Sequence, residues 1–287
     1  MWYSLIWLTM LGKSAGRCLG VMGVFTTAND VPQRDLHRRY LSRFSSTAFG
    51  SCEPNQSKIL VRFILCSKTL TNELIGEQKE HMDLIVLPSS ENMNDGKTLD
   101  YFALMARSSF DADFILKADI DAFVHVDNLV SVLVRFKNPR QEFAYYGRVI
   151  GRFPVPDHGW IMGCLYGMTY NLVQHFAAVA ETRSMSLRGG EDKVSTRIAA
   201  KVASSTNQTC TWITDNYIHD HPDCGCGPNA VPFSANTVAV HQLKAYSLWN
   251  STLQYFFGAN ETFHIMQGLQ TRNFPGLQYR TCKRIMD

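Results

Sequence analysis

Two carboxylates stand one residue apart at the expected end of a buried strand. Residues 114–129 read F-I-L-K-A-D-I-D-A-F-V-H-V-D-N-L, so an apolar run leads into Asp119 and Asp121. In an extended chain these two side chains point to the same side, and ligands of open α/β sheets collect at the carboxyl ends of strands. Two like charges held this close need a proton or a cation. We therefore predict a divalent metal ion that carries a diphosphate; the alternative is a turn whose acids cap the next helix.

A cluster of basic side chains follows the first expected strand. Arg34 and Arg38 lie in it, together with His37, Arg39 and Arg43. The cluster predicts either an anion site near that strand or a solvated helix face. Any phosphate would have to be bound by such side chains and a metal, because the chain lacks the G-x-G-x-x-G turn of dinucleotide folds and the G-x-x-x-x-G-K-[ST] phosphate loop.

Residues 219–226, which read H-D-H-P-D-C-G-C, suggest a different metal chemistry. His219, His221, Cys224 and Cys226 are residue types that bind zinc. Their spacing departs from the usual C-x₂₋₄-C and H-x₃₋₅-H pairs. A zinc module is therefore an alternative to the site at the paired acids.

Strands and helices alternate along the chain and must position these residues. Such alternation predicts an α/β fold with a mostly parallel sheet and covering helices. Strands are expected over residues 21–27, 59–66, 83–87, 114–121, 143–151 and 238–243, and helices over 32–44, 72–81, 96–107, 128–136, 172–180, 191–202 and 246–257.

Residues 151–170 are rich in Gly, Pro and aromatic side chains. This composition predicts a loop-rich binding wall in the less regular second half of the chain. Trp160 and Tyr166 could stack there on a ligand, or simply pack.

The composition and net charge limit which classes of protein this chain can belong to. A chain of 287 residues with 45% hydrophobic and 18% charged residues can bury a sizeable core. The net charge of +3 is too mild for a nucleic-acid-binding protein, which usually carries a concentrated basic stripe. We therefore expect no nucleic-acid partner.

Several features favour a lumenal location. The eight cysteines permit disulfides, and N-glycosylation sequons occur at Asn55, Asn207, Asn250 and Asn260. Residues 2–11 are apolar but only about half as long as the ~20 residues that a spanning helix requires. Residues 1–19 fit equally the remnant of a longer membrane anchor and an amphipathic lead-in strand or helix, and we predict no membrane span from them.

Five segments, in order, make the chain resemble glycosyltransferase family 31, the β-1,3-galactosyltransferase-like group. The resemblance runs from about residue 20 to residue 257, and two of the segments look most like the plant-type branch of hexosyltransferases. The segments are Arg34-x-x-x-Arg38, residues 91–98 (E-N-M-N-D-G-K-T), residues 117–124 (K-A-D-I-D-A-F-V), Glu191-Asp192 and residues 238–244 (V-A-V-H-Q-L-K).

The resemblance implies a GT-A-like domain over residues 20–287, with a donor half at about 20–130 and an acceptor half at about 131–260. It also implies an inverting transfer of galactose or N-acetylhexosamine from a UDP-sugar to a glycan or glycoprotein, with Mn²⁺, or alternatively Mg²⁺, as cofactor. Membrane association in the Golgi lumen is the implied location.

The resemblance assigns a role to each candidate site residue. Asp121, His241 and Asp119 would hold the metal, with Asp119 also serving the donor. Asp192, with Glu191 beside it, would take the acceptor proton, since inversion needs a base opposite the leaving group. Donor contacts are expected from Arg34, Arg38 and Lys97.

Two departures from the family pattern keep a second hypothesis open. Ile120 replaces the middle acid of the usual three, and no glycine follows Asp192 at the family's position. The alternative is a catalytically inactive homologue that binds nucleotide-sugars or glycans.

Overall fold

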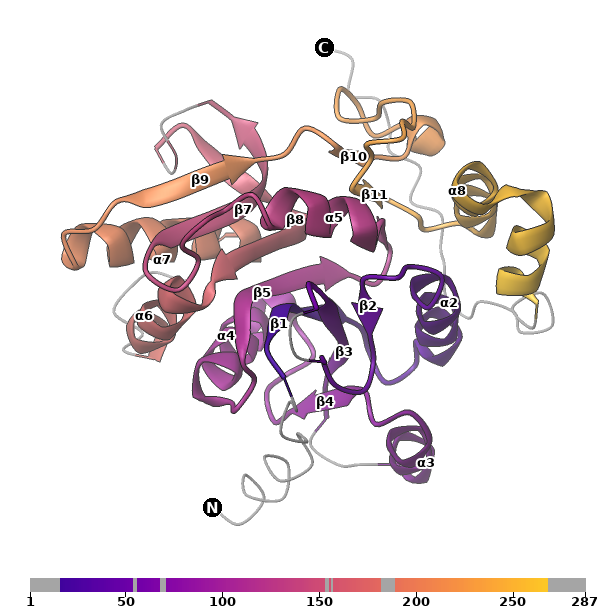
Figure 1. Ribbon diagram of the computed structural model, residues 1–287, viewed down its shortest axis with the longest axis horizontal. Helices are drawn as coiled ribbons and strands as arrows, with labels where there is room; N and C mark the ends of the chain where they lie inside the picture. The colour runs from indigo at the N-terminus through magenta and orange to yellow at the C-terminus, as the bar shows by residue number, and fades with distance from the viewer. Residues whose placement is uncertain are drawn as a thin grey trace.

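A large, mostly parallel sheet forms the centre of the molecule (Figure 1). The computed structural model describes residues 16–53, 56–67, 71–152, 155, 157–181 and 189–267. The apolar segment at residues 2–11 and the sequon at Asn55 lie outside these ranges. The predicted α/β class is confirmed.

The sheet has eight strands in the order β2-β3-β1-β5-β8-β7-β9, with β4 beside the second half of β3. Only β8 runs antiparallel to its neighbours. The strands are β1 (Cys18–Phe25), β2 (Thr47–Ala48), β3 (Ile59–Cys66), β4 (Leu84–Leu87), β5 (Ala112–Asp119), β7 (Phe143–Gly151), β8 (Gly159–Thr169) and β9 (Cys210–Thr214).

Seven α-helices are described, and they divide between the two faces of the sheet. Alternate residues of β1, β3 and β5 point to opposite faces, which produces two separate cores. Helices α2, α5 and α8 pack on one face, and α4, α6 and α7 pack on the other (Figure 1). The helices are α2 (Val31–Leu41), α3 (Asn72–His81), α4 (Lys97–Arg107), α5 (Val126–Leu133), α6 (Tyr170–Glu181), α7 (Glu191–Ser205) and α8 (Tyr246–Met266).

Local signals explain most helix ends. Pro32 occupies the first turn of α2, where its missing N–H costs nothing. Thr71 caps α3 by accepting a hydrogen bond from Leu74 N, and α3 ends where Met82 turns left-handed. The predicted helices are present, although α8 continues past residue 257 to Met266 across a non-helical Gly258.

A second, three-stranded sheet lies at the carboxyl end of β5. Its order is β10-β11-β6, formed by β10 (Ile218–Asp220), β11 (Ala239–His241) and β6 (Phe123–Val124). Strand β11 pairs parallel to β10 and antiparallel to β6. Because β6 follows the paired acids almost directly, this sheet brings His241 to them from more than 100 positions further along the chain.

The loop predicted over residues 151–170 is wrong in its larger part. Residues 159–169 form β8, an 11-residue strand between β5 and β7. The glycines that suggested a loop instead permit close packing, since a Cβ on Gly167 would lie 2.9 Å from the side chain of Leu116. Tyr166 is fully buried within this strand, so it does not stack on a sugar.

One disulfide is described, and it joins Cys18 to Cys52. It ties the start of β1 to the loop before β3, and both residues are buried. None of the helices in the described ranges is long and apolar enough to cross a membrane.

Breaking this disulfide should destabilise the protein markedly. The bond closes a 34-residue separation, for which the chain-entropy relation gives about 3.8 kcal/mol. We expect Cys52→Ala to lower the free energy of unfolding by about this amount, measured by urea titration without reductant. Cys210→Ala, which removes a free thiol, is the control. Equal losses in the two variants would contradict a structural role for the disulfide.

Candidate functional site

The paired acids and His241 meet at the carboxyl end of β5. Asp119 is the last residue of β5, and Asp121 lies in the turn that follows. His241 Nε2 lies 3.5 Å from Asp121 Oδ1 and 3.8 Å from Asp119 Oδ2. One ligand atom from each of the three residues lies within 4.8 Å of the others, and all three side chains are partly exposed. These atoms are close enough together to share one divalent cation.

A third carboxylate, that of Asp220, orients the histidine. His241 Nδ1 lies 3.0 Å from Asp220 Oδ1, across the register that pairs β10 with β11. A ligand histidine that hydrogen-bonds a carboxylate through its other nitrogen has its ring orientation fixed. Asp220 therefore directs His241 Nε2 toward the two acids. The sequence analysis missed Asp220, because only the pairing of β10 with β11 reveals its role.

The pKa shifts of His241 and Asp121 indicate that positive charge is favoured at this position. Burial lowers the pKa of His241, but hydrogen bonds and charges from Asp121 and Asp220 outweigh burial and raise it to about 10. Burial raises the pKa of Asp121, but the hydrogen bond and charge of His241 lower it overall. The acids thus attract positive charge into this position. Two carboxylate oxygens and one imidazole nitrogen are a donor set that suits Mn²⁺.

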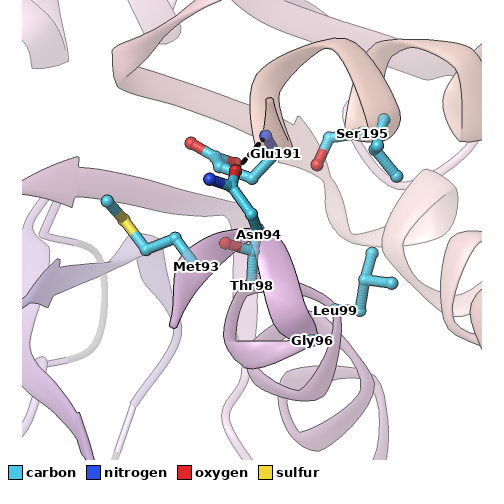
Figure 2. A pocket seen from close by; sticks show the side chains of 8 residues that line it. Met93, Asn94, Gly96, Thr98, Leu99, Glu191 and Ser195 are labelled. Carbon is cyan, nitrogen blue, oxygen red and sulfur yellow. Dashed lines mark hydrogen bonds between the residues drawn. The ribbon is translucent and has the colours of Figure 1, made fainter. Parts of the chain in front are cut away.

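Glu191, at the start of α7, has each of its polar groups engaged. Its Oε1 accepts a hydrogen bond from Lys117 at 2.8 Å, and its Oε2 accepts one from the Tyr166 hydroxyl at 2.7 Å. Its backbone N–H donates to Asn94 Oδ1 at 2.9 Å (Figure 2). Burial raises the pKa of this carboxyl, and the charge of Lys117 opposes that effect. Glu191 is therefore anchored on three sides.

Asp192 is less constrained than Glu191. Its Oδ1 accepts a hydrogen bond from Lys193 N, and no hydrogen bond reaches its Oδ2 from the described ranges. It lies over β8, since a Cβ on Gly163 would stand 3.7 Å from Asp192 Oδ2 and 3.1 Å from Glu191 Oε1. Nearby, the Lys193 ammonium lies 4.2 Å from the centre of the Trp160 ring. Asp192 thus offers an available carboxylate oxygen, and its neighbour in sequence, Lys193, contacts the partly exposed Trp160 ring.

A pocket opens where the start of α4 approaches the start of α7 (Figure 2). The short helix η1 (Met93–Asp95) precedes α4 and supplies one wall. The buried hydroxyl of Thr98 has no hydrogen-bond partner in the described ranges. The pocket is lined by Met93, Asn94, Gly96, Thr98, Leu99, Glu191, Val194 and Ser195. Asn94 gains a role from this arrangement, because it joins the loop before α4 to α7.

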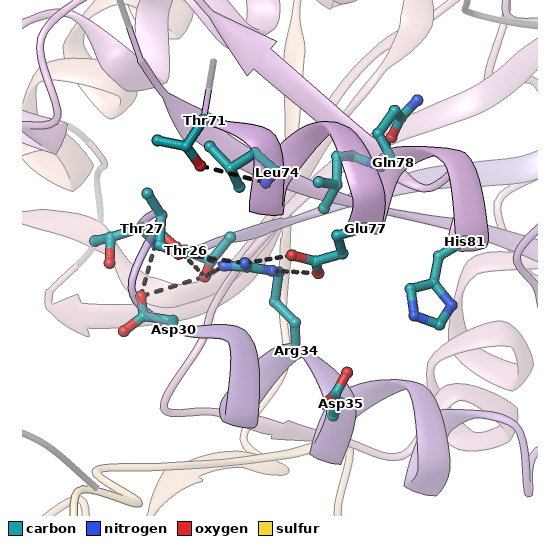
Figure 3. Close-up of polar contacts among 12 residues, drawn as sticks. Thr26, Thr27, Asp30, Arg34, Asp35, Thr71, Leu74, Glu77, Gln78 and His81 are labelled. Atoms are coloured by element: carbon teal, nitrogen blue, oxygen red, sulfur yellow. Dashed lines mark hydrogen bonds and ion pairs between the residues drawn. The ribbon is translucent and has the colours of Figure 1, made fainter. Parts of the chain in front are cut away.

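Arg34 and Arg38 are bound by carboxylates of the protein itself. Arg34 is fully buried and makes two hydrogen bonds to Glu77, at 2.8 and 2.7 Å (Figure 3). It also donates to the carbonyl oxygen of Thr27 just after β1. Arg38 donates to Glu77 and, through two nitrogens at 2.9 Å, to Asp83. These contacts tie α2 to α3 and β4, and the predicted donor contacts stay a prediction.

Lys97 is similarly enclosed. Its ammonium donates to the carbonyl oxygen of Thr26 at 2.6 Å and pairs with Glu91. Glu91 in turn accepts a hydrogen bond from Cys66 N at 2.6 Å. These bonds fasten the loop before α4 to the carboxyl ends of β1 and β3. A direct contact between Lys97 and a donor stays a prediction.

The four zinc-type residues do not assemble into a ligand set. His219 contacts Thr237, and His221 contacts Ser251. Within the described ranges, Asp119, Asp121 and His241 form the one group of His, Cys, Asp and Glu side chains close enough to share an ion. The zinc hypothesis is therefore wrong for the described structure.

Comparison with known proteins adds one family. Residues 50–160 match the family model described as Galactosyltransferase. The matched range contains Asp119, Asp121 and the loop before α4, but not His241, Glu191 or Asp192. No curated protein matches the chain.

Neutralising Asp220, the carboxylate that hydrogen-bonds His241 Nδ1, should weaken metal binding. We expect Asp220→Asn to lower Mn²⁺ affinity by about tenfold or more, because loss of such an outer carboxylate typically costs 10- to 100-fold. Titration calorimetry with MnCl₂ measures the effect. Asp223→Asn, at an exposed position three residues away, is the matched control. Unchanged affinity in Asp220→Asn would argue against this metal position.

The Arg34–Glu77–Arg38 ion pairs should make stability depend on pH. Burial raises the pKa of Glu77, but hydrogen bonds and charges from Arg34 and Arg38 outweigh it, so the pKa falls below its ordinary 4.5. Stability from Glu77 is then present above about pH 4.5 and is lost as the pH falls through the lowered native value.

We expect Glu77→Gln to cost about 3 kcal/mol at pH 7, the usual loss when one partner of a buried pair is removed. The difference from wild type should shrink below about pH 4.5, as followed by urea unfolding across pH. Glu80→Gln, on the same helix and 75% exposed, should change stability little at any pH. A pH-independent difference for Glu77→Gln would refute the assigned ion pairs.

Proposed function

Residues 50–160 carry the β-1,3-galactosyltransferase-like domain of glycosyltransferase family 31, and from this premise we propose that the protein is a metal-dependent, inverting hexosyltransferase. The family domain supports hexosyl transfer as the class of reaction. Metal dependence, the inverting outcome and the substrates are our proposal. The assignment to the plant-type branch stays a prediction.

One observation carries the proposal. Asp119 and Asp121, from the matched domain, meet His241, from outside it, with their ligand atoms within 4.8 Å. Asp220 supports the histidine from behind. The donor set fits a resident Mn²⁺, with Mg²⁺ as the alternative. When bound, such an ion would neutralise the negative charge that develops on a departing diphosphate.

The remaining catalytic roles belong to side chains of the protein, beginning with the general base. We propose that Asp192 accepts the proton of the acceptor hydroxyl, because its Oδ2 is available while both oxygens of Glu191 are engaged. Lys193, the residue after Asp192, lies over the Trp160 ring, and we propose that these two side chains offer a surface for an acceptor sugar. A positioned general base typically contributes about 10²- to 10⁴-fold to the rate.

The donor side is built from the carboxyl ends of β1, β3 and β5. Lys97 binds the carbonyl oxygen of Thr26, and Arg34 binds that of Thr27. We propose that these two cations and Arg38 shape the donor side by holding these segments. A UDP-sugar carrying galactose or N-acetylhexosamine is the proposed donor, and a glycan or glycoprotein is the proposed acceptor.

We propose residence in the Golgi lumen. The Cys18–Cys52 disulfide supports an oxidising compartment. The sequon at Asn207 lies in an exposed turn after α7, which agrees with passage through the secretory pathway.

Ile120 favours one alternative, a binding protein without transferase activity. Its side chain packs against the hydrophobic core on the α2 face, at the position where the family pattern has an acid. A homologue that keeps the outer acids could still bind a metal and a nucleotide-sugar. Turnover distinguishes the two functions.

Transfer assays with a panel of UDP-sugars and glycan acceptors test the proposal. With MnCl₂ present, we expect the wild-type protein to transfer sugar, and Asp121→Ala to lose both UDP binding and transfer. Asp192→Asn should keep Mn²⁺-dependent UDP binding but lower kcat by about 10²- to 10⁴-fold. Asp111→Asn, just before β5 at its opposite end, should transfer like wild type.

Two results would count against enzymatic function. Mn²⁺-dependent UDP binding without turnover on any acceptor would favour the binding protein. Equal transfer by wild type and Asp121→Ala would reject the assigned metal site.

A further inference from the structure

Lys117 is a buried cation between the metal acids and α7. Its side chain is fully buried in the middle of β5. The ammonium donates hydrogen bonds to the carbonyl oxygen of Gly163 at 2.6 Å and to Glu191 Oε1 at 2.8 Å. It forms an ion pair with Asp119 Oδ1 at 2.6 Å. One ammonium thus contacts three acceptors on three elements, β5, β8 and α7.

We propose that Lys117 is a positioning residue that holds the first turn of α7, and with it Asp192, against the metal acids. The inference rests on the proposed function for its catalytic consequence. That Lys117 joins β5 to α7 follows from its contacts with Asp119 and Glu191. It also gives Glu191 a defined role as the anchor of α7, so that Asp192 is the acid left for chemistry.

The geometry assigns the two oxygens of Asp119 to different partners. Oδ1 pairs with Lys117, while Oδ2 faces His241 at 3.8 Å. Lys117 therefore determines which oxygen of Asp119 is offered to a metal. Glu191, on the other side of the ammonium, is held away from the group formed by Asp119, Asp121 and His241.

The surroundings of Lys117 leave it little freedom. Its ammonium lies 5.5 Å from the centres of the Phe25 and Tyr166 rings. Tyr166 also donates to Glu191 Oε2, and Asn94 accepts from Glu191 N. The first turn of α7 is thus held by groups on β5, β8 and η1, which is how a supporting shell keeps a reactive group in place.

Removing Lys117 alone would leave two enclosed carboxylates without their shared cation. Asp119 and Glu191 have side chains only 16% and 10% exposed. An unpaired buried charge is strongly destabilising, whereas removal of both partners often is not. Neutralising Glu191 as well should therefore recover part of the stability that Lys117→Met loses.

A double-mutant cycle in metal-free buffer tests whether Lys117 holds α7 to β5 through Glu191. Thermal unfolding is measured in EDTA for wild type, Lys117→Met, Glu191→Gln and the double variant. We expect Lys117→Met to lower Tm more than the double variant does. Arg62→Met combined with Glu191→Gln is the control cycle, because Arg62 is a buried cation that hydrogen-bonds only backbone carbonyls in the described structure. This control should give additive shifts, and additive shifts for Lys117 and Glu191 would overturn the proposal.

Transfer kinetics separate positioning from folding. In the double variant we expect Tm to recover while kcat stays about 100-fold below wild type, since small misplacements of reacting groups cost that much. Arg62→Met should keep its kcat at a temperature where it is folded. A kcat that recovers together with Tm would make Lys117 merely structural and would overturn the proposal.

The two proposals fail in different ways. If wild type transfers no sugar from any UDP-sugar, the proposed function fails, and the metal-free cycle still decides whether Lys117 ties α7 to β5. If wild type transfers sugar but the cycle is additive, only the role of Lys117 fails.

Discussion

Charge compensation among enclosed carboxylates is the constraint on which this site depends. Asp119, Asp121, Asp220 and Glu191 gather at the carboxyl end of β5, where desolvation disfavours charge. His241 and Lys117 lie between these acids and offset part of their negative charge. The balance is local, so each acid has a defined partner, and the position between Asp119, Asp121 and His241 is the one that a divalent cation can take.

The two sheets make this arrangement possible. The parallel core of β1, β3 and β5 ends at one edge, and the paired acids follow β5 there. The small sheet then returns the chain to the same edge, with Asp220 and His241 in adjacent register. Lys117 lies two residues before Asp119, on the same face of β5, where β8 and α7 enclose it. One strand therefore carries both the metal acid Asp119 and Lys117, the residue that anchors the helix of the proposed base.

Much of the fold could be predicted from the sequence, because strands buried on both faces read as nearly continuous apolar runs. Residues 59–66 are such a strand, interrupted only by Arg62. Residues 159–169 could not be read this way. Their glycines have the composition of a loop, but they serve close packing against Leu116 and Glu191. Short strands such as β6 and β10 carry too few residues for a periodic signal, although they position His241.

The sequence by itself determined the paired acids, their place after a buried strand and the alternation of strands and helices, because these are properties of neighbouring residues. Only the tertiary structure decided the partners of each charge. It joined Asp220 to His241, Asn94 and Lys117 to Glu191, and Glu77 to both Arg34 and Arg38. These pairs span from 21 to 97 positions, and the register of strands and the packing of helices bring them within hydrogen-bonding distance.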